Sequence, residues 1–222
     1  MKTLVIFDLD GVLVDACEWH RIALNKALYE VSGYEIPIEE HHSEFNGRPT
    51  RVKLSKLVDR GIIEEKDIDA VYALKQKFTI ETIEESAHRR QEKVDLMLWL
   101  KEKDFLIACF TNSIRETAEL MLKKTGVFEM LDMIVTNEDV KNPKPDPEGY
   151  LKIMKKLRVY PDNVIIVEDS PTGLKAAVDS TAGTVVEVSG PKVVNIDLLK
   201  DGLARMAAGT MISSRNLPGY EK

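Results

Sequence analysis

Residues 3–14 read TLVIFDLDGVLV, and this stretch decides the fold. Its first five residues form a short, almost continuous apolar run, which is typical of a strand buried on both faces of a parallel sheet. Two aspartates, Asp8 and Asp10, follow the run at once. Further apolar runs of this kind occur at residues 105–110, 133–135, 164–167 and 184–188. The sequence therefore predicts a parallel sheet whose first strand ends at an acidic pair.

Amphipathic helices are predicted between these strands. One segment carries apolar residues at the helical spacing i, i+3, i+4 and i+7, namely Tyr150, Ile153, Met154 and Leu157. Residues 118, 121 and 122 repeat part of the pattern, and Gly126 is a plausible helix stop. Strands that alternate with helices indicate an α/β protein with a Rossmann-like parallel sheet.

Residues 16–90 interrupt this alternation with helical patterns and no convincing strand. A parallel crossover needs about a dozen residues, so a much longer helical segment indicates an inserted α-helical cap domain. We expect a Rossmann-like catalytic core formed by residues 1–15 and 91–205, a cap over 16–90, and a C-terminal tail over 206–222. Because ligands of open α/β sheets bind outside the carboxyl ends of the strands, the cap is expected to act as a lid.

Composition narrows the choice of partners. The 222 residues are 44% hydrophobic and 31% charged, with a net charge of -6, so no basic footprint for nucleic acid exists. Two cysteines are too few for a disulfide framework. The N-terminal apolar run is too short for a signal peptide or a membrane span. We expect a cytoplasmic monomer that acts on a small molecule, with no nucleic-acid or membrane partner.

Polar side chains follow the strands that we place in the middle of the sheet. They are Asp8 and Asp10 after the first strand, Thr111, Asn112 and Ser113 after residues 105–110, and Glu168 and Asp169 after residues 164–167. Lys144 lies in the proline-rich segment NPKPDPE ahead of a predicted helix. Each motif alone is weak, since a DxD is usually a turn and a TNS triplet is usually a helix cap. All of them at one sheet edge, in this order, indicate a site.

A cluster of carboxylates there needs positive charge. Two unit charges 4 Å apart repel by roughly 4 kcal/mol at an effective dielectric of 20. No arginine stands beside either acidic pair. Mg²⁺, which favours a few carboxylates together with water and phosphate oxygens, would relieve the repulsion. Lys144 would keep Asp8 ionised and neutralise a phosphoryl group, and Thr111 could donate to phosphate oxygens.

The strings FDxDGVL, KPxPE and VEDSxxG resemble the haloacid dehalogenase superfamily, in particular its β-phosphoglucomutase-like branch with a helical cap. The resemblance covers roughly residues 1–190 and implies that Asp8 is the nucleophile and Asp10 the general acid and base. It implies phosphate binding by Thr111 and Lys144. It also implies Mg²⁺ binding by Asp8, the backbone carbonyl of Asp10, and one or both of Glu168 and Asp169. Residues 91–93 read QEK where relatives often carry Pro-Gly.

Substrate selection is expected from the cap. His20, Arg48 and Arg51 are candidate substrate ligands there, together with Asn112 in the core, while Lys75 and Lys77 are weaker candidates. His41 and His42 lie in a charged segment and are expected to be solvated. The β-phosphoglucomutases carry an arginine three residues after the glycine that matches Gly47, where this chain has Thr50.

These expectations lead to a Mg²⁺-dependent phosphatase that hydrolyses a small phosphorylated metabolite, such as a sugar phosphate, through a phosphoaspartyl intermediate. A phosphomutase of the β-phosphoglucomutase type shares the whole core and is the alternative. Thr50 favours water over a second sugar hydroxyl as the acceptor. A non-enzymatic alternative is a receiver-like phospho-acceptor domain, against which the chain length, the cap and Asp10 argue.

Overall fold

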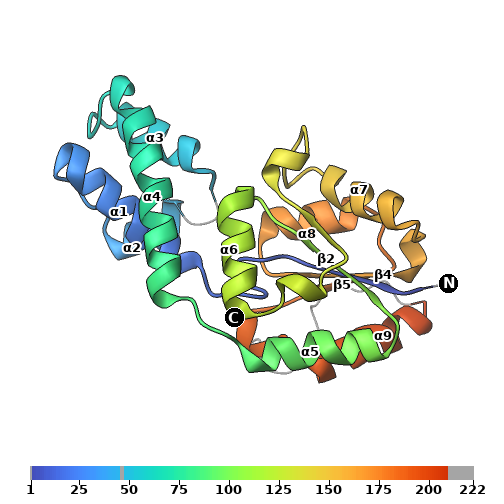
Figure 1. Ribbon diagram of the computed structural model, residues 1–222. Coiled ribbons are helices and arrows are strands. Elements are labelled where there is room, and N and C mark those ends of the chain that lie inside the picture. The colour runs from blue at the N-terminus through green and yellow to red at the C-terminus, as the bar shows by residue number, and fades with distance from the viewer. Residues whose placement is uncertain (1, 46–47, 210–222) are drawn as a thin grey trace. The chain divides into compact units, whose positions relative to one another are not determined.

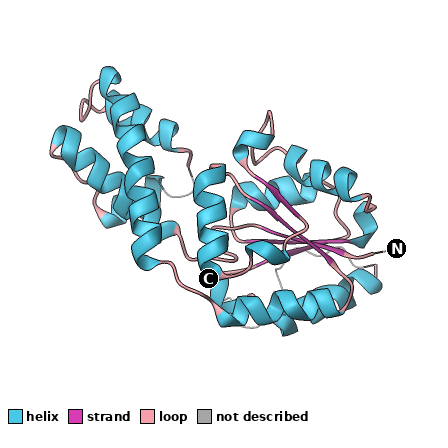
Figure 2. Ribbon diagram, in the orientation of Figure 1, coloured by secondary structure: helices cyan, strands magenta, loops and turns pink. Residues whose placement is uncertain are grey.

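The computed structural model describes residues 2–45 and 48–209. Its centre is a parallel sheet of five strands in the order β3-β2-β1-β4-β5 (Figures 1 and 2). The strands are β1 (Leu4–Phe7), β2 (Leu106–Phe110), β3 (Met133–Val135), β4 (Val164–Glu168) and β5 (Thr184–Glu187). All five predicted strands are confirmed, with ends that differ by one residue at most. The predicted α/β fold class is confirmed as well.

β1 lies in the middle of the sheet because every one of its side chains is apolar and fully buried. Its last residue, Phe7, pairs with Cys109 of β2 and with Val167 of β4. The residues that follow these three strands therefore meet at one edge of the sheet.

Helices cover both faces of the sheet (Figure 1). The helices and single helical turns of this unit are α5 (Gln91–Glu102), α6 (Arg115–Thr125), η3 (Phe128–Met130), η4 (Asn137–Asp139), α7 (Glu148–Leu157), η5 (Pro161–Asn163), α8 (Pro171–Asp179), η6 (Pro191–Val193) and α9 (Ile196–Ala207). Tyr150 and Ile153 of α7 and Ala176 of α8 join the apolar cluster that contains Ile6 of β1. α7 and α8 therefore pack on one face, while α5 and α9 contact β2 and β5 from the other.

The chain divides into two compact units. Ala16–Ala87 forms one unit, and the described parts of Met1–Asp15 and His88–Lys222 form the other. The sequence places this boundary three residues later, after Arg90. The difference arises because the last cap helix ends at Ser86, and the Arg90 amide already donates to Thr125 O of the core at 3.1 Å.

Every described regular element of the unit Ala16–Ala87 is helical. These elements are α1 (Cys17–Ser32), α2 (Ile38–Glu40), η1 (His41–Phe45), α3 (Thr50–Asp59), η2 (Glu65–Asp67) and α4 (Ile68–Ser86). The stripe predicted on α1 is buried at Leu24, Ala27 and Leu28, and these side chains pack with Leu54 and Phe78. His41 is only 2% exposed, so the expectation that it is solvated is wrong.

The C-terminal boundary also differs from the prediction. Residues 206 and 207, assigned to a tail, still belong to α9, which Asn195 caps through a 3.0 Å bond from the Leu198 amide. α9 packs on β5 and β4 through Leu199 and Gly202, and this burial extends the helix beyond the end of its visible apolar period. Residues 208 and 209 form a turn, and residues 210–222 of the predicted tail lie outside the described residues. No helix among the described residues is long and apolar enough to cross a membrane.

Candidate active site

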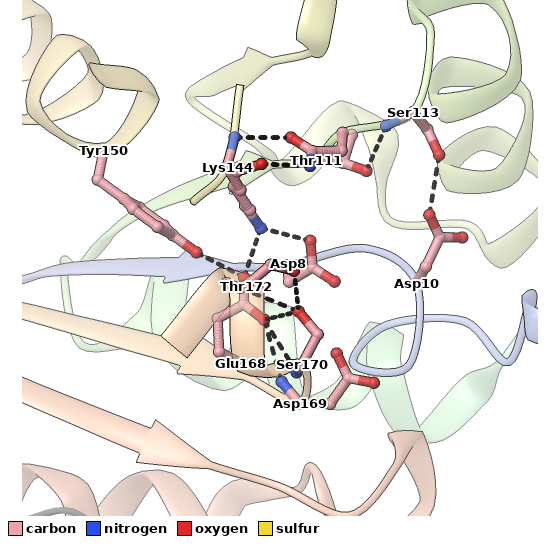
Figure 3. A network of polar contacts seen from close by, with 12 residues as sticks. Asp8, Asp10, Thr111, Ser113, Lys144, Tyr150, Glu168, Asp169, Ser170 and Thr172 are labelled. Carbon is pink, nitrogen blue, oxygen red and sulfur yellow. Dashed lines mark hydrogen bonds and ion pairs between the residues drawn. The ribbon is translucent and has the colours of Figure 1, made fainter. Parts of the chain in front are cut away.

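The carboxyl ends of β1, β2 and β4 bring the polar residues of the sequence motifs together (Figure 3). Asp8 follows β1 directly, and its amide continues the ladder by donating to Val167 O at 3.0 Å. Its side chain is 10% exposed. Burial raises the pKa of the Asp8 carboxyl, and the nearby Glu168 and Asp10 raise it further, whereas Lys144 lowers it. Asp8 is thus a buried acid that needs positive charge to remain ionised.

Lys144 is the positive charge closest to Asp8. Its Nζ donates to Asp8 Oδ1 at 2.6 Å and to Glu168 Oε1 at 2.5 Å. The ammonium also lies 4.8 Å from the centre of the Phe110 ring and 5.3 Å from that of Tyr150. Burial lowers the pKa of Lys144, but the charges of Asp8 and Glu168 outweigh this effect and raise it. The lysine is therefore a fixed cation beside the Asp8 carboxylate.

Glu168, at the end of β4, is fully buried, and both of its carboxylate oxygens accept protein hydrogen bonds. Oε1 accepts from Lys144 and, at 2.8 Å, from the Tyr150 hydroxyl. Oε2 accepts from the amides of Asp169 and Ser170 at 3.1 and 3.4 Å. A Cβ on Gly173 would lie 1.9 Å from Glu168 Oε1, so only glycine leaves room for this carboxylate.

Asp169 offers a different environment. Its Oδ1 is buried and accepts no hydrogen bond within the described part of the chain. Burial, together with the charges of Glu168 and Asp10, raises the pKa of Asp169 to about 7. One carboxylate oxygen from each of Asp8, Glu168 and Asp169 lies within 4.8 Å of the others. A buried acceptor without a donor in an all-oxygen acidic cluster fits a hard divalent cation such as Mg²⁺.

Asp10 belongs to the turn that follows β1, where the Gly11 amide donates to Val14 O at 2.7 Å. Its Oδ2 accepts from the Ser113 hydroxyl at 2.8 Å. The Ser113 amide in turn donates to Thr111 Oγ1 at 3.0 Å. These bonds connect the turn after β1 with the segment after β2 and give the Asp10 carboxylate a defined direction (Figure 3).

Asn112 joins two loops of the site. Its side-chain nitrogen donates to Lys144 O at 3.1 Å, and its side-chain oxygen accepts from the Lys144 amide at 3.0 Å. The amide group thus pairs with the backbone of Lys144 as a neighbouring strand would. Asn112 thereby orients the lysine that contacts Asp8, and its predicted role in substrate binding stays a prediction.

The other predicted substrate ligands lie in the unit Ala16–Ala87. His20 Nδ1 lies 3.4 Å from the Lys75 ammonium on α4. Arg51 donates to Asp69 at 3.0 Å, and its guanidinium lies 4.9 Å from the centre of the Tyr72 ring. Arg48 is exposed. Their roles in substrate binding stay predictions.

Sequence reasoning gave no role in the site to Tyr150, Ser113 or Ser170, although Ser113 was counted among the polar residues at the sheet edge. Tyr150 looked like one apolar position of a helix stripe, and its ring does pack in the core, but its hydroxyl reaches Glu168. Ser113 belongs to the TNS triplet, but its hydrogen bond to Asp10 could not be predicted because the two residues are 103 positions apart in the sequence. Ser170 Oγ lies 3.3 Å from Glu168 Oε2 and also caps α8 by accepting from the Gly173 amide.

Known proteins resemble the chain over nearly its full length. It is 27% identical to a "phosphorylated carbohydrates phosphatase" of Thermotoga maritima, over 93% of this chain and 91% of that protein. It is 28% identical to the pyrophosphatase PpaX of Bacillus velezensis, over 87% of this chain and 88% of that one. The solved structure of β-phosphoglucomutase from Clostridium difficile superposes with a TM-score of 0.75 at 21% identity, over 94% of this chain and 100% of that one.

The family pattern described as "Haloacid dehalogenase-like hydrolase" matches residues 5–186. This range includes the strand ends that carry Asp8 and Glu168 and the loop before α7 that carries Lys144. It also includes the whole unit Ala16–Ala87. The chain therefore belongs to the haloacid dehalogenase-like hydrolase family, as its sequence motifs indicated.

Proposed function

We propose that this haloacid dehalogenase-like hydrolase is a Mg²⁺-dependent phosphatase that hydrolyses a small phosphomonoester, such as a sugar phosphate, through a phosphoaspartyl intermediate on Asp8. The observation that carries the proposal is the buried Asp8 carboxylate, 2.6 Å from the Lys144 ammonium and grouped with Asp169. Two of the relatives described above are named as a phosphatase and a pyrophosphatase, which supports the proposal.

In the first step an Asp8 carboxylate oxygen attacks phosphorus while the bond from phosphorus to the alkoxide breaks. Asp10 gives its proton to the leaving oxygen. In the second step Asp10 takes a proton from water, whose oxygen attacks the phosphoaspartate and releases inorganic phosphate and the Asp8 carboxylate. Lys144 balances the negative charge of the transferring group, and the Thr111 hydroxyl donates to one of its oxygens.

Mg²⁺ would be held by Asp8, the backbone carbonyl of Asp10 and Asp169. Glu168 is the weaker ligand candidate because both of its oxygens already accept protein hydrogen bonds. The cation would supply charge that lets the anionic Asp8 approach an anionic phosphate. The raised pKa of Asp169, about 7, is consistent with a carboxylate cluster that lacks one positive charge.

The cap would exclude bulk water during the first step and contribute His20, Arg48 and Arg51 to substrate selection. We also propose that the protein works as a cytoplasmic monomer. A phosphomutase is a second candidate because a solved β-phosphoglucomutase has the same fold and the core chemistry is shared. Thr50, in place of an arginine of those relatives, favours water as the acceptor.

The test is phosphate release from a panel of phosphorylated metabolites in the presence of Mg²⁺. Multiple turnovers on at least one member are expected. Hexose 1-phosphates with the matching bisphosphate primer form a separate arm, in which both free phosphate and isomerised hexose phosphate are followed. Isomerisation faster than phosphate release would replace the phosphatase by the mutase, and the absence of both reactions would refute the assignment.

The nucleophile is tested by Asp8→Asn. A carboxamide cannot attack phosphorus, so the variant should lose at least about 4 kcal/mol of transition-state stabilisation, roughly a thousandfold in rate. Asp95→Asn makes the same chemical change on the exposed side of α5 and should retain full activity. Turnover of Asp8→Asn near that of Asp95→Asn would show that another group attacks phosphorus.

A further inference from the structure

The proposed reaction gives no role to the hydroxyl of Tyr150, although this hydroxyl lies beside the reacting groups. Tyr150 belongs to the first turn of α7 and is fully buried. Its hydroxyl donates to Glu168 Oε1 at 2.8 Å (Figure 3). Burial raises the pKa of Tyr150, and the charges of Glu168 and Asp8 raise it further, although Lys144 opposes them. The hydroxyl therefore stays protonated and donates a hydrogen bond to a carboxylate.

Glu168 Oε1 accepts from a second donor, the ammonium group of Lys144, at 2.5 Å. The same ammonium group donates to Asp8 Oδ1 at 2.6 Å, so two buried carboxylates compete for one positive charge. Attraction between charges is strong in a buried site because little water screens it. Without a further donor on Oε1, the Glu168 carboxylate would attract the ammonium group away from Asp8. The Tyr150 hydroxyl offsets part of the charge on Oε1 and thereby weakens this attraction.

The ring of Tyr150 fixes the direction of this hydroxyl. It packs edge-to-face against Phe110, with ring centres 4.8 Å apart and ring planes at 89°. A Cβ on Gly149 would lie 2.2 Å from the Phe110 ring, so a glycine at this position lets the start of α7 approach Phe110 closely. The same two rings also face the Lys144 ammonium group. Packing of the Tyr150 ring therefore holds the hydroxyl at the position from which it reaches Glu168.

We propose that Tyr150 is a positioning residue of the reaction, which acts by keeping the Lys144 ammonium group on Asp8 and on the phosphoryl group that Asp8 receives. The inference rests on the proposed function. Lys144 balances charge that develops as the phosphoryl group is transferred, so its position matters more in the transition state than in the bound ground state. Loss of the Tyr150 hydroxyl should therefore lower kcat and leave KM nearly unchanged.

The variant that tests this role is Tyr150→Phe, which removes the hydroxyl and keeps the ring. Its kcat on p-nitrophenyl phosphate with Mg²⁺ should fall on the order of 10-fold, the lower end of what a hydrogen bond to a charged group contributes. Its KM should change by less than about twofold. Tyr160→Phe removes a hydroxyl from a 65% exposed residue of the same unit and should keep the wild-type kcat and KM. Circular dichroism checks that both variants are folded at the assay temperature.

A second background separates positioning of Lys144 from packing of the core. In Glu168→Gln the side chain carries no negative charge and competes weakly for the ammonium group, so adding Tyr150→Phe should lower kcat by no more than about twofold. A hydroxyl that only stabilises the fold would give the same loss in both backgrounds. Equal fold losses in the two backgrounds, an unchanged kcat in Tyr150→Phe, or an effect confined to KM would overturn the inference. Each of these results leaves the phosphatase assignment intact, because wild-type turnover is measured in the same assay.

A binding measurement tests the inference without turnover. Orthovanadate adopts the five-coordinate geometry of a phosphoryl group in transfer and should raise the melting temperature of the wild type. We expect Tyr150→Phe to lose much of this rise and Tyr160→Phe to retain it. Such a loss in a protein that hydrolyses none of the tested esters would refute the proposed function and still support the role of Tyr150 in placing Lys144. An equal rise in the two variants would overturn the inference.

Discussion

Lys144 and Glu168 show at the scale of single residues how opposite charges are balanced inside a core. Both side chains are nearly or fully buried, and each would be costly alone. Lys144 contacts two carboxylates, Asp8 and Glu168, while Glu168 gains further donors from Tyr150 and from backbone amides. Both Glu168 oxygens therefore already accept hydrogen bonds from protein groups, and in the proposed metal site Asp8 and Asp169 are the better ligand candidates.

A prediction at this scale concerns Asp10. With an activated aryl phosphate the leaving group hardly needs an acid, but the second step still needs a base to deprotonate water. Asp10→Ala should therefore give a burst of aryl alcohol followed by slow turnover in rapid-mixing kinetics. Asp15→Ala changes an exposed aspartate five residues later and should show the wild-type time course. Dephosphorylation of Asp10→Ala at the wild-type rate would exclude Asp10 as the base.

At the scale of elements, the site depends on hydrogen bonds between the loops that follow the strands. The segment between β2 and α6 holds Asp10 through Ser113 and Lys144 through Asn112. The loop before α7 is held from its other side, since the amides of Lys141 and Asn142 donate to Glu148 at 2.8 and 2.9 Å. Hydrogen bonds made by the loop residues therefore hold the loops in place. The strands contribute by bringing the loops to the same edge of the sheet.

Asn112→Ala removes both bonds to the Lys144 backbone and should lower kcat/KM by roughly tenfold, the value of one or two net hydrogen bonds. Asn142 lies in the same loop as Lys144, and its side chain contacts Glu148 at the start of α7. Asn142→Ala should lower kcat/KM much less. If Asn112 acts by orienting Lys144, its loss should have little further effect in a Lys144→Met background. Fully additive effects of the two changes would instead indicate a direct contact of Asn112 with substrate.

At the scale of the whole molecule, segments distant in sequence share one sheet edge, and the proposed metal should link them. Mg²⁺ should raise the melting temperature, because a ligand at about 100 times its dissociation constant adds roughly 2.7 kcal/mol to the free energy of unfolding. Asp169→Ala should remove most of this response, whereas Asp162→Ala, an exposed position on η5, should retain it. Full activity in excess chelator would contradict a metal site at these carboxylates.

A second prediction at this scale concerns Lys93, a fully buried lysine of α5 that donates to the carbonyl oxygens of Pro191 and Val194. These bonds hold the start of α5 against the segment that leads into α9. Burial lowers the pKa of Lys93 to about 8 in the folded chain. The unfolded chain, with a lysine pKa of about 10.4, binds more protons between these values, so this group adds stability as the pH rises.

The comparison is the free energy of unfolding of wild type and Lys93→Met, measured by denaturant titration at pH 7.5 and 9.5. The free energy of unfolding of the wild type minus that of Lys93→Met should be larger at pH 9.5 than at pH 7.5 by about 1–3 kcal/mol. Lys192→Met, an exposed lysine nearby, should show no such change. An equal difference at both pH values would mean that Lys93 stays protonated in the folded protein.

The sequence determined the sheet and the edge at which the polar residues gather. The apolar runs are long enough only for short strands, and parallel strands end on one side, so Asp8, Thr111 and Glu168 had to meet there. The length of the interval between the first two strands likewise required an inserted helical unit. Local pattern is sufficient for such features because each depends on neighbours in the chain.

Only the tertiary structure decided which of these polar groups contact each other. The bonds of Asn112 to Lys144, of Ser113 to Asp10 and of Tyr150 to Glu168 join residues on different elements, and no spacing predicts them. The burial of Lys53 and His41 was hidden for the same reason, since charged and polar residues are expected at the surface until packing encloses them. Side-chain burial and pairing depend on the whole fold, whereas strand and helix formation depend mostly on local sequence.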